Sequence, residues 1–203
     1  MFSLLIPVKD VLRRNRSWLI LAAVIFAAGA FYAGLGATFQ AELPADMENQ
    51  FVELEQLFEI ILNNPPLITA SLVFTKNFAA MIQMLFLGAL AGISPLATLF
   101  LNGYLLGIVA AAVKAGGGSV AGALILGILP HGIFELSAFF LCGALGLKMG
   151  YHCIAAPLPG KTRLQSFKYI WKEVVSVIPL VTILLLGAAL IEIFVTSRLV
   201  GLN

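Results

Sequence analysis

The chain has 203 residues, of which 61% are hydrophobic and only 11% are charged, and its formal net charge is +2. Soluble domains are usually about 45–50% apolar and about 25% charged, so these charges are too few to cover a globular surface. The composition argues against a soluble enzyme and a disordered tail, and the small net charge argues against a nucleic-acid partner. We therefore expect one membrane domain, residues 1–203, embedded in a lipid bilayer.

The first hydrophobic segment, residues 17–37, is long enough to cross a bilayer, which takes about 20 apolar residues. Basic residues precede it, and a signal peptide would carry them too. However, this apolar segment is longer than the roughly 7–15 apolar residues of a signal peptide. We predict an uncleaved first span.

Residues 38–75 form an acidic segment without any Lys or Arg. Its apolar residues recur at spacings of three and four, which indicates one apolar face of an amphipathic helix. We place this helix at the outer membrane surface, although packing against the transmembrane bundle would use the same face. The acidic residues are Glu42, Asp46, Glu48, Glu53, Glu55 and Glu59, and the apolar residues are Met47, Phe51, Leu54, Phe58 and Ile61.

Residues 77–113 are predicted to form a helical hairpin of two short spans, 77–93 and 95–113. Only Ser94 and Pro95 separate the two apolar runs. Serine suits a helix N-cap and proline suits the first helical position, so the second helix is expected to begin there.

Residues 119–147 contain no Lys or Arg and are interrupted by Pro130. A proline in a helix removes one backbone hydrogen bond, here to the carbonyl of Leu126, and crowds the preceding turn. We predict two half-helices that meet at residues 129–132, with Gly132 starting the second. They form either one broken crossing or a re-entrant half followed by a crossing.

Residues 148–173 are predicted to be a basic cytoplasmic loop that ends in a helix on the membrane surface, and residues 174–195 to be the last span. Five crossings then put nine of the 12 basic residues on one side, which the positive-inside rule makes the cytoplasm. The N-terminus is cytoplasmic, and the acidic segment and C-terminus are external. Lys76, Lys114 and Arg198 also fall outside. The expected fold is an all-α bundle in the cell membrane, with one crossing broken at Pro130 and an external amphipathic helix.

His131 and Glu135 are the candidate functional residues. A charge in the middle of a span costs about 2.5–3.5 kcal/mol on insertion scales, and Glu135 is in that position. His131 lies one helical turn before it, so both side chains share a helix face. Asn102 could add an oxygen to this intramembrane polar site, although a mid-membrane Asn more often bonds to a neighbouring helix.

Three interpretations of the pair stay open. A structural pair would satisfy itself and the broken backbone. An ion or proton site could hold zinc or another divalent metal, although two ligands are too few for zinc. Catalysis would need further groups, and a metalloprotease HExxH motif is absent. We expect no enzyme activity and no cofactor beyond such a metal.

Four pairs of glycines match the G-x-x-x-G spacing that lets membrane helices approach closely. Most are expected to serve packing within the chain, and a symmetric homodimer is a further expectation. Glu192 lies near the outer end of the last span, where it can reach the interface, so we assign it a structural role. Cys142 and Cys153 are assigned to packing. The glycine pairs are Gly88/Gly92, Gly103/Gly107, Gly118/Gly122 and Gly146/Gly150.

The stretch LPHGIFELSA at residues 129–138, followed by Gly143 and Gly146, resembles the HG-x-x-E signature of the stage II sporulation protein M family. Phe74–Asn77, Gly88–Gly92, Asn102-Gly103 and Gly107 are similar to the hairpin that precedes this signature. The resemblance is good over residues 74–150 and extends to the ends only by general layout. Ser137 departs from the family pattern, in which we expect Pro or a similar residue.

The resemblance implies an integral protein of the cytoplasmic membrane. The family's founding member acts in engulfment during sporulation, where it anchors a complex with two peptidoglycan-degrading proteins. The function implied here is a membrane scaffold that recruits other membrane or cell-envelope proteins. The alternative is a transporter or channel for an ion or small solute that uses His131 and Glu135.

Overall fold

The computed structural model describes residues 6–38 and 64–199, and the regular structure within these ranges is entirely helical. Five segments are long and apolar enough to cross a membrane, which confirms the predicted all-α membrane protein. These segments are Arg16–Leu35, Pro66–Leu87, Ile93–Ala115, Val120–Ile154 and Arg163–Leu199.

The N-terminal part consists of a short helix α1 (Val8–Arg14) and the first span, α2 (Arg16–Thr38). They meet at Asn15, whose side-chain amide donates a hydrogen bond to the carbonyl of Val11. The span agrees closely with the predicted residues 17–37.

The hairpin differs from its prediction at both helix starts. Its first helix, α4 (Pro66–Leu87), begins at Pro66 rather than at residue 77, because proline is well tolerated at the first helical position. The second helix, α5 (Ile93–Ala115), is preceded by Gly92 with φ +71°, so Gly92 and not Ser94 is the N-cap. A positive φ suits glycine, which carries no Cβ.

This change shortens the predicted acidic segment 38–75. Residues 66–75 are the first half of α4, while the predicted amphipathic helix itself lies in residues 39–63, outside the described residues. Lys76, which the charge pattern places outside the membrane, lies in the middle of α4.

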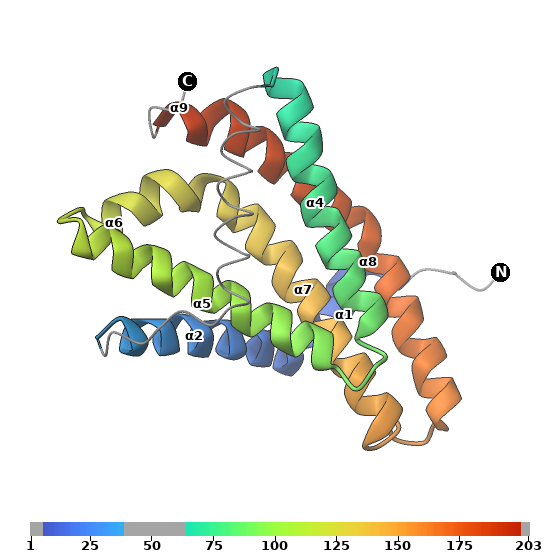
Figure 1. Ribbon diagram of the computed structural model, residues 1–203. Helices are drawn as coiled ribbons and strands as arrows, with labels where there is room; N and C mark the ends of the chain where they lie inside the picture. Colours follow the sequence, from blue (N-terminus) through green and yellow to red (C-terminus); the bar gives the residue numbers. More distant parts are fainter. Residues whose placement is uncertain (1–5, 39–63, 200–203) are drawn as a thin grey trace.

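The predicted broken helix is present, but the break has another form. A single turn, α6 (Val120–Gly122), leads into a π-helix, η1 (Ala123–Ile128), and then into α7 (Leu129–Ile154). The second helix therefore begins before Pro130 and not at Gly132. The backbone N–H of Leu129 bonds five residues back, to Leu124, so a widened turn absorbs the crowding that the proline ring would cause. The chain bends sharply at this junction (Figure 1).

The predicted cytoplasmic loop 148–173 is mostly helical. Lys148 is buried inside α7, and α8 (Arg163–Ile191) begins eleven residues before the last predicted span. Thr162 and Gln165 form a capping box at its start. The helix continues through a second π-helix, η2 (Glu192–Thr196), into α9 (Ser197–Leu199). Only the residues between α7 and α8 form a loop here.

The helices converge at one end and spread apart at the other (Figure 1). α2 and α5 run side by side in the same direction and form one arm, while α4 and α8 form the other. The α4–α5 turn and the α7–α8 loop lie at the converging end.

The second half of α7 is enclosed by the other helices: every residue from Leu141 to Gly150 is buried. Glycines make this enclosure possible, because they remove the Cβ atoms that would keep two backbones apart. A Cβ on Gly88 would lie 2.6 Å from the Cα of Gly146, and one on Gly150 would overlap the backbone of Gly92. Gly88 and Gly92, at the end of α4 and in the turn that follows it, therefore pack against Gly146 and Gly150 of α7.

The pair Gly103/Gly107 serves a second contact within the chain. A Cβ on Gly103 would overlap the carbonyl oxygen of Phe26, and one on Gly107 would overlap that of Ala30, so these glycines seat α5 against α2. Gly122 meets only Ser119 of its own turn. As expected, most of the pairs pack within one chain.

Replacing Gly146 with alanine is predicted to destabilise the protein. The new Cβ would lie 2.7 Å from the carbonyl oxygen of Met84, and such overpacking costs about 1–3 kcal/mol. Gly187→Ala is the matched control in α8, since a Cβ there meets nothing within 4 Å and alanine favours a helix. Thermal melts in detergent should show a lower Tm for Gly146→Ala and an unchanged or higher Tm for Gly187→Ala. Equal melting points would contradict the close contact.

Candidate intramembrane polar site

The structure brings His131 and Glu135 together on α7 and adds a third residue, Glu192. One ligand atom from each of the three residues lies within 4.8 Å of the others. All three side chains are partly buried. The predicted pair is therefore part of a larger group of ionisable residues.

Glu192 is the residue that sequence reasoning missed. It is the first residue of η2, and the η2 segment packs against both η1 and the start of α7. Thr196, at the end of η2, is buried and its Oγ1 lies 3.1 Å from Nδ1 of His131. The i, i+4 spacing of Glu192 and Thr196 was the available signal, because it repeats the spacing of His131 and Glu135.

A π-helix lies at or directly before each of the two segments that supply these residues. η1 ends directly before α7, three residues ahead of His131, and η2 contains Glu192 and Thr196. π-helical turns are rare and frequently lie at functional sites. The unusual backbone is thus concentrated where the polar side chains meet.

Lys76 adds a positive charge to this region. From the middle of α4 it interacts electrostatically with both Glu135 and Glu192. The two carboxylates also repel each other. Four ionisable residues on three helical segments therefore act on one another within the spans.

A cavity of about 230 Å³ lies beside His131 and Glu135, between α7 and the α2–α5 arm. Asn102 of α5 lines it together with Gly132. The Asn102 amide, however, donates to the carbonyl of Thr98 in its own helix, at 2.8 Å, and within residues 6–38 and 64–199 no bond from it to a neighbouring helix is found. The rest of the lining is mainly apolar: Phe26, Leu105, Leu106, Val109, Ile128, Leu136 and Phe139.

The helix break positions the site differently from the expectation. Because α7 begins at Leu129, Gly132 lies in the first turn and Glu135 in the second. The favourable effect of a helix N-terminus on an anion is confined to about the first turn, so it does not reach Glu135. His131 contacts Thr196 and does not donate to the carbonyl of Leu126.

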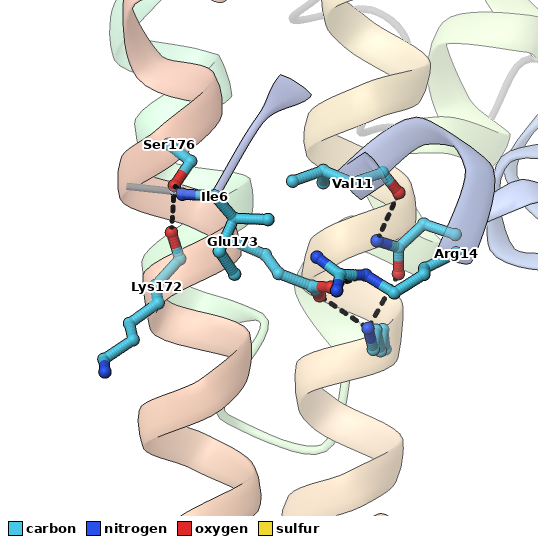
Figure 2. A network of polar contacts seen from close by, with 8 residues as sticks. Ile6, Val11, Arg14, Lys172, Glu173 and Ser176 are labelled. Carbon is cyan, nitrogen blue, oxygen red and sulfur yellow. Dashed lines mark hydrogen bonds and ion pairs between the residues drawn. The ribbon is translucent and has the colours of Figure 1, made fainter. Parts of the chain in front are cut away.

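A second polar cluster is buried at the converging end, and sequence reasoning missed it as well. Lys148 Nζ of α7 donates to Glu173 Oε2 of α8 at 2.5 Å and to Asn15 Oδ1 at 2.8 Å. The Lys148 side chain is 6% exposed and that of Glu173 is fully buried. Arg14 Nε lies 3.5 Å from the other carboxylate oxygen of Glu173. Figure 2 shows Arg14 and Glu173 meeting where α1 crosses the neighbouring helices.

Further contacts fasten the N-terminal residues to α8. The backbone N–H of Ile6 donates to Ser176 Oγ, which itself donates to the carbonyl of Lys172 (Figure 2). Cations surround the Tyr169 ring, with Arg14, Lys148 and Lys161 at 5.3–5.9 Å from its centroid. These partners are structural, because they satisfy charges that would be costly to bury alone.

The two clusters have different chemical capacities. In the Lys148 cluster a carboxylate already has a cation beside it. In the His131 cluster, an imidazole and two carboxylates converge beside a cavity, which is a set of groups that can bind a cation or carry protons. Cys142 is buried in the core of α7 and has no part in either cluster.

Comparison with known proteins decides the family. The family model described as Stage II sporulation protein M matches residues 18–197. The chain belongs to this family. The match confirms the resemblance and extends it well beyond residues 74–150, so that it includes Glu192 and Thr196.

An uncharacterized protein of Methanocaldococcus jannaschii is 28% identical over 127 residues, which make up 63% of this chain and 70% of that relative. No solved structure matches the chain. The family match therefore supports a membrane protein, and it does not specify a ligand for the polar site.

Proposed function

We propose that this member of the stage II sporulation protein M family is a multi-pass scaffold of the cytoplasmic membrane, without enzyme activity, that holds other membrane or cell-envelope proteins. The observation that carries the proposal is a groove of about 740 Å³ at the spread end of the bundle. It lies between α2, α5 and the start of the α6–η1 segment. Its lining is rich in small residues: Ala30, Gly34, Leu106, Gly107, Ala110, Ala111, Lys114, Ala115, Val120 and Leu124.

Small residues favour helix association in a membrane because they let two backbones approach closely. In the same pair of helices, Gly103 and Gly107 let α5 pack closely on α2. The groove continues that surface outward. Its proposed occupant is a transmembrane helix of a partner protein, and a second copy of the chain would use the same contacts.

The proposed orientation places the converging end in the cytoplasm. Eight basic residues that precede α2 or lie around the α7–α8 loop and the start of α8 are exposed, and the positive-inside rule assigns such ends to the cytoplasm. The alternating directions of five spans then put the C-terminus outside. The eight residues are Lys9, Arg13, Arg14, Arg16, Lys161, Arg163, Lys168 and Lys172.

Cysteine labelling tests this orientation. Single cysteines at Glu48 and Gly160, in a background without Cys142 and Cys153, are expected to react with an impermeant maleimide from opposite sides of sealed vesicles. The reason is that three crossings separate the two positions. Labelling of both from the same side would contradict the five-span topology.

Photo-crosslinking tests the groove. A photo-activatable residue at Ala110, which lines the groove, should give a discrete protein adduct in native membranes. The matched control is Ala112, which is exposed on the same helix and does not line the groove, and it should give lipid adducts. An adduct with the mass of two chains would identify the homodimer. Lipid adducts alone at both positions would contradict the scaffold and favour the alternative, a transporter or channel that uses the cavity beside His131 and Glu135.

A further inference from the structure

Three side chains that commonly bind metals meet where the start of α7 packs against η2. They offer one imidazole nitrogen and two carboxylate oxygens, from His131, Glu135 and Glu192. We propose that these residues bind one divalent first-row metal ion, zinc above all, and that Thr196 positions the histidine. The site is separate from the groove of the scaffold proposal, so either can fail alone.

The donor set and its spacing suit such an ion. Zinc accepts His nitrogen and Glu oxygen at about 2.0–2.2 Å, which puts tetrahedral ligand atoms about 3.4 Å apart. The three ligand atoms lie within 4.8 Å of one another, so modest side-chain rotations bring them to that distance. Three protein ligands with an open fourth position are typical of zinc sites that also hold water or another ligand.

The charges at the site also favour a cation. The carboxyl groups of Glu135 and Glu192 lie close enough to repel each other when both are ionised. Their mutual repulsion is opposed by the single charge of Lys76, which acts on both. Metal binding favours the ionised form of both carboxyl groups, so the ion gains two anionic oxygen ligands beside a neutral histidine.

Thr196 supplies the outer contact that metal-binding histidines usually have. A ligating histidine donates its other ring N–H to a neighbouring acceptor, which fixes the tautomer and the ring orientation. Thr196 Oγ1, 3.1 Å from Nδ1 of His131, is such an acceptor. The proposal therefore assigns Nδ1–H to Thr196 and Nε2 to the metal.

The backbone and the cavity complete the argument. η1 and η2 place π-helical turns on both segments that supply ligands, an arrangement frequent at functional sites. The cavity of about 230 Å³ borders His131 and Glu135 and has room for a few water molecules, which could fill the open position.

Zinc titration of the purified full-length chain tests the proposal. After treatment with a chelator, the wild type in detergent is expected to bind one Zn²⁺ per chain, measured by calorimetry and by metal analysis. Glu192→Gln and Glu135→Gln should each weaken binding at least about 100-fold, and Thr196→Val about 10–100-fold, as outer-contact changes do. His152→Gln and Asp10→Asn are the matched controls, since both residues lie away from the site, and they should bind like the wild type.

Two results would overturn the proposal. One is a wild-type Kd for Zn²⁺ weaker than about 1 mM. The other is equal affinity in the wild type, Glu192→Gln and Glu135→Gln. If one carboxylate variant does not fold, the other and Thr196→Val still decide the question. Photo-crosslinking at Ala110 should be the same in wild type and Thr196→Val, which separates this test from that of the scaffold.

Discussion

A single buried charge, Lys148, stands in the part of α7 that the other helices enclose. An ammonium group cannot stay there unpaired, because removing it from water costs far more than packing returns. Glu173 of α8 and Asn15 before α2 meet this requirement directly, and Arg14 Nε lies 3.5 Å from the second carboxylate oxygen of Glu173. The pair therefore dictates where α8 and the N-terminal helices sit against α7, and it closes one end of the bundle.

The rest of the architecture follows from that closed end. Glycines bring the α4–α5 turn onto α7 near Lys148, so the helices have little freedom there. Beyond the break before Pro130 no comparable pair or glycine contact joins the two arms in the described residues, and they spread apart (Figure 1). Both features with functional potential, the small-residue groove and the His131 cluster, lie in this opened part. The converging end thus holds the helices together, and the opened part contains both of the proposed binding sites.

Local patterns predicted a good part of this structure. Hydrophobic length found five spans, Pro130 marked the break, and the spacing of His131 and Glu135 put both on one face. The predictions that failed concern residues whose positions depend on contacts between segments distant in the sequence. Lys76 was taken as a span boundary and Lys148 as the start of a loop, because a charge in isolation favours water. Lys76 lies within α4, where Glu135 and Glu192 act on it from other elements. Lys148 lies within α7, where Glu173 of α8 pairs with it. Glu192 was predicted to reach the membrane interface for the same reason, because no local sequence pattern predicts that η2 packs against α7.

A double-mutant cycle on Lys148 and Glu173 tests this account most directly. Lys148→Met and Glu173→Leu should each lower the free energy of unfolding by about 3–5 kcal/mol, because each leaves a buried charge without its partner. The double variant should lose clearly less than the sum of the two, since it buries no unpaired charge of this pair. Lys172→Met, a change at an exposed neighbour, should have little effect. Small or simply additive losses in the two single variants would contradict the claim that this ion pair organises the bundle.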